Sequence, residues 1–116
     1  MTLPLIEAAW AHWLEGTTEV AYPTAPGDVR ISLLSVTQIV RTVYDASILV
    51  ELWADRATSD ADAVALHARS RAIDSAPDAL AHFTRVTADG PVLHPDPDSR
   101  DLDRYQFMVS FRVRTR

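Results

Sequence analysis

Cysteine is absent from this chain of 116 residues, and glycine occurs only at positions 16, 27 and 90. A chain without cysteine forms no disulfide, no cysteine-ligated zinc site and no thiol nucleophile, and the redox compartment is left open. Isolated glycines cannot build the glycine-rich loop that cradles a phosphate, and no serine lies in the pattern of a nucleophile elbow. The sequence therefore predicts no enzyme and no cofactor.

Lysine is also absent, so all the basic residues are arginines, and the formal net charge is -5. An acidic chain lacks the general basic footprint of a nucleic-acid binder. Arginine does supply fork-shaped donors that suit carboxylates at protein interfaces. No basic residue precedes the first apolar residues, and Pro4 and Glu7 interrupt them. We therefore expect neither a signal peptide nor a membrane span, and a soluble chain made in the cytoplasm.

The clearest pattern is an unbroken alternation over residues 104–114. Apolar side chains occupy every second position, which places them on one face of a strand. They are Tyr105, Phe107, Val109, Phe111 and Val113. Because a strand needs paired neighbours and a cover for its apolar face, the rest of the chain must supply both.

Other segments supply those neighbours. Helical spacing over residues 3–14 predicts a short amphipathic helix that stops at Gly16, and alternation predicts strands from Val29 and from Ala46 to Ala54. Residues 82–88 favour another strand. Leu49 and Trp53 fall on the outer face of the second strand, where either a helix or another subunit could cover them.

The longest predicted helix begins at Thr58 or Ser59 and ends at Pro77. A helical wheel places alanines, Val64, Leu66 and Ile73 on the buried arc, and places His67 and Ser70 on the solvent arc. A helix buried through alanine can lie close against a sheet. His67 is then a hydrated side chain without a catalytic partner.

Two segments lack a clear period. Residues 35–45 have β-branched side chains without alternation, so their conformation is left open, with a long hairpin loop as one interpretation. Residues 91–103 contain three prolines and predict a long loop. Together the elements predict one α+β domain over residues 1–116, with about four mostly antiparallel strands and two helices packed on one face.

Three groups of side chains invite a binding interpretation. Four aspartates over residues 96–103 could attract calcium, but the segment lacks the central glycine and closing glutamate of a calcium loop, so a solvated acidic loop is favoured. The four histidines lack zinc-ligand spacing. Trp10 and Trp13 could form a ligand platform, yet packing on the sheet is the simpler interpretation.

Arginines gather near the C-terminus, and Arg104, Arg112 and Arg114 share one strand face. Two interpretations stay open for this face. The arginines either form a solvated outer face that discourages edge pairing, or meet acidic loops of a neighbouring copy.

The C-terminal half carries a recognisable order of motifs. Phe83–Ala88 is followed by Gly90-Pro91, by Leu93-His94-Pro95-Asp96-Pro97-Asp98 and by Arg104-Tyr105-Gln106-Phe107-Met108-Val109. With the tryptophan-bearing first helix and the strand Leu49–Ala54 before an Ala/Arg-rich helix, this order resembles the tail terminator (tail completion) family of long-tailed phages and prophages. Residues 35–45 differ because they lack a glycine-rich turn.

The resemblance implies a structural virion protein that forms a ring, usually of six, at the head-proximal end of the tail tube. Such a ring ends tube polymerisation and provides the head-joining surface. The implied partners are other copies of the chain, the major tail tube protein and the head-tail connector protein. DNA would only pass through the lumen, and no membrane is involved.

Loops on a rigid sheet usually carry recognition, which selects the candidate interface residues. They are Arg41, Thr42, Leu93, His94, Asp96, Arg112 and Arg114; catalytic and metal-binding residues are not expected. Two alternatives remain for the function: another head-tail neck protein, such as a stopper or adaptor, and a small-ligand-binding α+β domain.

Overall fold

A computed structural model gives the structure, which describes residues 3–20, 24–73, 82–98 and 101–114. The elements are α1 (Leu3–Leu14), β1 (Val29–Val40), β2 (Val43–Asp55), α2 (Ser59–Arg71), β3 (His82–Ala88), β4 (Val92–Leu93) and β5 (Leu102–Arg114). The predicted α+β class is confirmed, with five strands where about four were expected. The extra strand, β4, lies within the segment that was predicted to be a loop.

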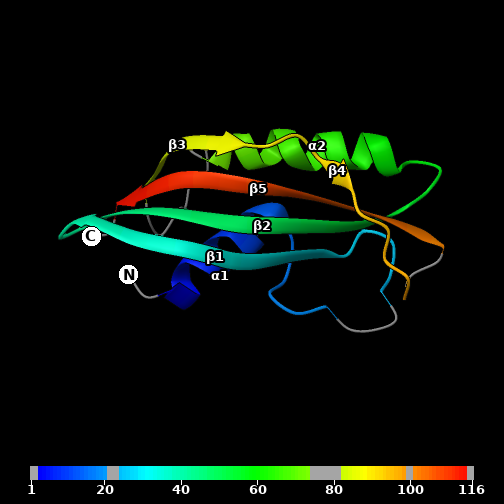
Figure 1. Ribbon diagram of the computed structural model, residues 1–116, viewed down its shortest axis with the longest axis horizontal. Coiled ribbons are helices and arrows are strands. Elements are labelled where there is room, and N and C mark those ends of the chain that lie inside the picture. The colour runs from blue at the N-terminus through cyan, green and yellow to red at the C-terminus, as the bar shows by residue number, and fades with distance from the viewer. Residues whose placement is uncertain (1–2, 21–23, 74–81, 99–100, 115–116) are drawn as a thin grey trace.

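The sheet has the order β1-β2-β5-β3, with β4 pairing on β5, and all these pairs are antiparallel (Figure 1). The central pair is unbroken, from Val43 opposite Arg114 to Asp55 opposite Leu102. The last strand of the chain is therefore an interior strand, which explains its regular alternation: one of its faces is buried along most of its length.

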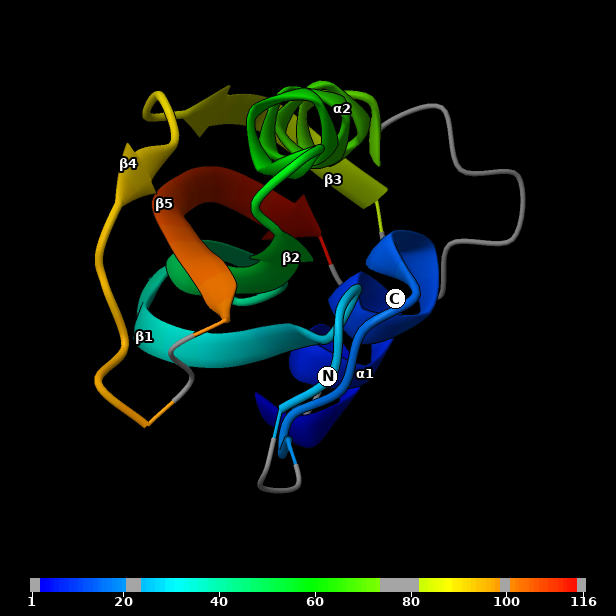
Figure 2. The ribbon, with the colours of Figure 1, turned by 90° about the vertical axis from the view of Figure 1, so that its right-hand side faces the viewer.

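The core lies between one face of this sheet and both helices. Phe107, Val109, Phe111 and Val113 are all buried, as the alternation predicted. The ring centres of Trp10 in α1 and Phe111 are 5.0 Å apart, and those of His67 in α2 and Phe107 are 5.3 Å apart. Since both aromatic partners point to the same face of β5, both helices cover that face, with α1 beside β1 and α2 beside β3 (Figure 2).

The end of α1 differs from the prediction in one detail. Glu15, not Gly16, adopts the left-handed conformation that terminates the helix, with φ of 55°. Gly16 is required for another reason: a Cβ there would lie 2.9 Å from Cγ1 of Val29. The glycine thus allows the chain leaving α1 to pass directly over β1.

The orientation predicted for α2 is wrong at Val64 and Ser70, whereas Ile73 just after the helix is buried as predicted. Its buried positions are Ser59, Ala63 and Ser70, whereas Val64 is 64% exposed. His67 is half-buried, and its Nε2 lies 3.3 Å from the carbonyl oxygen of Ala88. The small side chains let the helix approach the sheet. Ser59 and Ser70 can be buried because their hydroxyls donate hydrogen bonds to Asp103 and to the Leu66 carbonyl. The predicted end at Pro77 lies outside the described residues.

Residues 35–45 form the far half of a long hairpin. β1 and β2 remain paired up to Val40 opposite Val43, so the connection is a tight turn at Arg41 and Thr42, not a long loop. Register shifts after Leu33 and after Gln38 interrupt the pairing. These irregularities, together with exposure of both faces, explain why the sequence shows no period here.

Candidate functional site

The far half of the β1–β2 hairpin exposes apolar side chains. Leu34, Ile39 and Val40 are 51%, 46% and 58% exposed, and we call these three residues the hairpin surface. β1 is an edge strand of the sheet. Thr17 bonds to the backbone of Val29 and Ile31, but no strand of the described chain covers the edge farther along. An apolar surface beside an open strand edge is suited to contact with another protein chain.

The predicted interface residues Arg41 and Thr42 form the turn at the tip of this hairpin. Both are exposed, and the Gln38 side-chain amide donates to the Arg41 carbonyl at 3.2 Å. The turn is therefore held by a local hydrogen bond while its two side chains face solvent. Their role at an interface remains a prediction.

Leu93 is in β4 and His94 follows it, so both residues lie across β5 from the β1–β2 hairpin. Both are exposed. The His94 backbone N–H donates to the Arg104 carbonyl at 2.8 Å, and Arg104 Nε donates to the His94 carbonyl at 3.0 Å. The first bond continues the β4–β5 pairing by one residue, and the two bonds together anchor this loop on β5.

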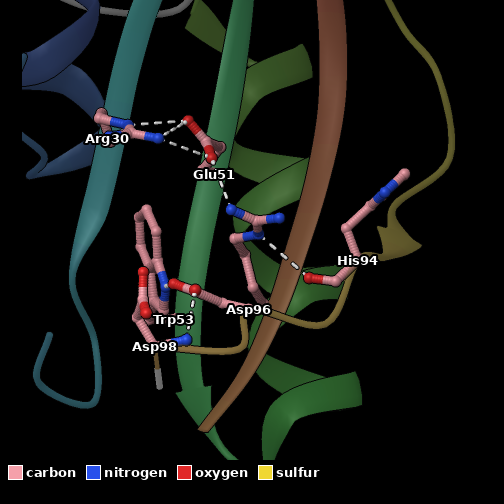
Figure 3. Close-up of polar contacts among 7 residues, drawn as sticks. Arg30, Glu51, Trp53, His94, Asp96 and Asp98 are labelled. Carbon is pink, nitrogen blue, oxygen red and sulfur yellow. Dashed lines mark hydrogen bonds and ion pairs between the residues drawn. The ribbon is translucent and has the colours of Figure 1, made fainter. Parts of the chain in front are cut away.

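Asp96 is placed differently from the other predicted interface residues, because its side chain is buried. Its Oδ2 accepts the indole N–H of Trp53 at 3.0 Å, and its Oδ1 accepts the Asp98 backbone N–H at 3.0 Å (Figure 3). Trp53 is fully buried on the outer face of β2. The cover of Trp53 that the sequence left open is therefore the chain's own loop, and Asp96 holds that loop in place.

Glu51 is a buried charge that the sequence analysis missed. Arg30 donates to it through Nε at 2.8 Å and Nη2 at 2.9 Å, and Arg104 Nη1 lies 3.7 Å away. The Arg30 guanidinium also lies over the Trp53 ring, 5.3 Å from its centre. The alternation of β2 placed Glu51 on the outer face, but only the strand register places it between two arginines.

Arg112 and Arg114 lie on the outer face of β5 near the hairpin. Arg112 forms a two-point ion pair with Asp45, through Nε at 2.8 Å and Nη2 at 3.2 Å. This hydrogen bonding lowers the pKa of Asp45, and the charge of Arg85 lowers it further. Arg114 is exposed. The two arginines differ in their surroundings, because Arg112 is held by a carboxylate partner whereas Arg114 faces solvent.

Within the described ranges, no group of three His, Asp or Glu side chains is arranged to hold a metal ion. Trp10 and Trp13 do not share a platform: Trp10 is buried against Phe83 and Phe111, while Trp13 lies under Arg69, whose guanidinium is 4.1 Å from the ring centre. No described helix is long and apolar enough to cross a membrane.

Comparison with known proteins gives no family assignment. No protein-family model matches the sequence, and no curated protein matches it significantly.

Proposed function

We propose that this protein is a structural virion protein that forms a ring at the head-proximal end of a phage tail tube. The ring ends tube polymerisation and provides the surface to which the head joins. The observation that carries this proposal is the hairpin surface: three exposed apolar side chains on a strand edge that no described strand covers along its outer half.

The shape of the protein supports assembly through this surface. The body is 46 Å long and about half as wide in the other directions, 23 and 22 Å. The hairpin forms one end of the long axis (Figure 1). A specific interface between two proteins buries roughly 800 Å² on each partner. An elongated subunit with an apolar hairpin can bury such an area against a neighbour while the sheet and helices remain a separate folded core.

The loop after β4 provides a second contact surface. Val92 and Leu93 are 54% and 46% exposed, and the loop that follows is held by the Asp96–Trp53 hydrogen bond. A loop fixed in this way loses little conformational freedom on binding, which favours recognition of a partner. We assign this surface to the tube protein or to the head connector protein.

Deletion of the gene from the phage or prophage that encodes it tests the proposal. Electron microscopy is expected to show overlong tails without heads, because the tube has lost its stop. Tails of normal length on intact particles would contradict the proposal. Filled or leaking heads beside normal, unattached tails would indicate that the protein is instead a connector, stopper or adaptor between head and tail.

A double substitution separates assembly from folding. Ile39→Ser with Val40→Ser removes apolar surface that is already exposed, so the free energy of unfolding is expected to change by only about 0.5 kcal/mol or less. Complementation of the deletion by this variant should fail, with overlong tails as the readout. Val64→Ser on α2 is the matched control, because Val64 is 64% exposed yet lies away from the hairpin. Normal tails with the double variant would remove the hairpin surface from the interface.

A further inference from the structure

The two ends of the sheet carry opposite charge. The β2–β5 pairing runs from Val43 opposite Arg114 to Asp55 opposite Leu102, so these ends lie about 40 Å apart at ~3.3 Å per residue. In Figure 1 the hairpin turn and the end of β5 lie together at one end, and the start of β5 lies at the other. Basic side chains gather at the first end and aspartates at the second.

At the basic end, an open pocket of about 370 Å³ lies on the outer face of the sheet. We call it the arginine pocket. Its charged lining is Arg85, Arg112 and Asp45, and the rest of its lining is Ser35, Thr37, Ala46, Ser47, Ser110 and Phe111. Arg112 already forms an ion pair with Asp45. Arg85 forms no ion pair with a described residue, and two arginines beside one aspartate leave the pocket with a net positive charge.

The backbone of Arg85 adds a second observation. Its φ is 53°, in the left-handed region, and it lies in a bulge where two residues of β3 oppose the single residue Phe111 of β5. Glycine usually occupies the left-handed position of such a bulge. A bulky residue in this conformation is strained, and strain of this kind often accompanies function. Here an arginine stands at that position and contributes to the pocket.

At the other end, aspartates surround the start of β5 and of α2, and we call this region the acidic end. Its exposed members are Asp55, Asp60, Asp62, Asp98 and Asp101. Asp103 is engaged by the Ser59 hydroxyl at 2.7 Å and by Arg56 at 3.4 Å. Asp98 and Asp101 form no ion pair with any described residue.

We propose that the arginine pocket of one copy binds the acidic end of a second copy, so that the copies associate head to tail. The inference rests on the proposed ring and names its subunit contact. A head-to-tail contact uses two different surfaces, and repeating it closes a ring when the rotation between neighbours allows closure. A second copy is favoured over nucleic acid because the chain is acidic overall and the complementary surface is present on every copy.

Two complementary variants test the contact directly. Arg85→Gly removes the positive charge of the pocket and relieves the left-handed strain, so the fold is retained. Asp98→Asn with Asp101→Asn removes charge from the acidic end without removing an ion pair of the described chain. Arg71→Gln and Asp89→Asn are the matched controls, because both side chains are exposed and belong to neither surface.

The readout is molar mass from sedimentation equilibrium at low and at high salt. The wild type is expected to self-associate at low salt and to dissociate as salt screens the contact. Each variant alone should associate roughly tenfold more weakly, the order expected for loss of a close interfacial charge pair. An equimolar mixture of the two variants should form a 1:1 heterodimer, because each retains the surface that its partner lacks. The control variants should behave as the wild type.

The contact would be overturned if the wild type stays monomeric at low salt and high concentration, or if the variants associate as the wild type does. It would also be overturned if the mixture of variants stays monomeric, or if the protein binds a DNA duplex more tightly than it binds a second copy. Circular dichroism should be used to check that each variant is folded.

The contact and the proposed function can fail separately. If the wild type is monomeric and the gene deletion still gives overlong tails, only this contact is overturned. If the deletion gives tails of normal length and the wild type still associates in a salt-sensitive way, only the proposed function is overturned.

Discussion

The indole N–H of Trp53 donates to Asp96 Oδ2 at 3.0 Å, and both side chains are buried although Trp53 lies on the outer face of the sheet. This contact joins β2 to the loop after β4, 43 residues later in the chain. The outer face of the sheet is thus partly covered by the protein's own loop, and the position of that loop depends in part on the hydrogen bond between Trp53 and Asp96.

Replacement of Trp53 by phenylalanine tests this dependence. Trp53→Phe keeps most of the ring but leaves the buried Asp96 carboxylate without its indole donor. We expect the free energy of unfolding to fall by about 1–3 kcal/mol, measured by urea denaturation. Trp13→Phe is the control, because Trp13 Nε1 donates to an exposed acceptor, the Arg69 carbonyl. Water can replace that donor, so equal losses for the two variants would contradict the role given to Asp96.

Glu51→Gln tests the buried carboxylate between Arg30 and Arg104. Glu51 is 4% exposed, and glutamine keeps its size while removing the charge. The expected loss is about 1–3 kcal/mol. It should stay below the ~3–5 kcal/mol typical of a broken buried pair, since the side chains of Arg30 and Arg104 are 30% and 24% exposed and can bind water.

The control for Glu51→Gln is Arg56→Gln, which disrupts an ion pair with Asp103 in which Arg56 is 63% exposed. That change should alter the free energy of unfolding by about 0.5 kcal/mol or less. Thermal and urea denaturation of both variants compare the two sites. A Glu51→Gln variant as stable as the wild type would show that the network adds nothing to stability.

Gly16→Ala tests the close approach of α1 to β1. An added Cβ would lie 2.9 Å from Val29 Cγ1 and 3.0 Å from the Val29 carbonyl oxygen. Because backbone must move to relieve the second contact, we expect a loss of about 1–3 kcal/mol. Gly90→Ala makes the same chemical change where no atom lies within 4 Å. That control should shift the unfolding midpoint little, and similar shifts for both variants would refute the packing argument.

Asp45 predicts a specific pH dependence. Its hydrogen bond with Arg112 lowers the folded-state pKa below the usual value of 3.8. The ionised form is therefore favoured by folding, so this contribution to stability is present above the unfolded-state pKa and is lost as pH falls through the folded-state pKa. Asp45→Asn should remove this part of the acid sensitivity. Carbon-13 NMR titration measures the carboxyl directly, and a midpoint at or above 3.8 would contradict the prediction.

The pattern of the sequence was sufficient where a strand has one buried and one exposed face. β5 is an interior strand with helices on one side, so its buried residues recur at every second position, and Phe107, Val109, Phe111 and Val113 were predicted correctly. Trp10 was likewise predicted to pack on the sheet. The same reasoning did not predict the conformation of residues 35–45, because the outer half of the hairpin is exposed on both faces and is interrupted by register shifts.

Hydrophobicity placed Val64 and Ser70 on the wrong sides of α2 because that helix buries small and polar side chains. Ser59 and Ser70 are buried with their hydroxyls hydrogen-bonded, while Val64 faces solvent. A helix that lies close to a sheet needs small side chains at the contact, and the hydrogen-bond partner of a serine is decided by distant parts of the chain. The half-buried His67 beside Phe107 follows from the same orientation.

The sequence by itself therefore determined the α+β class and the alternation of the closing strand, because these depend on local periodicity and on burial of one face. Only the tertiary structure decided that Asp96 covers Trp53, that Glu51 lies between Arg30 and Arg104, and that Arg85 contributes to a pocket with Arg112. Each of these contacts joins residues from different strands or loops. Their geometry is set by strand register and by a bulge, which local patterns do not encode.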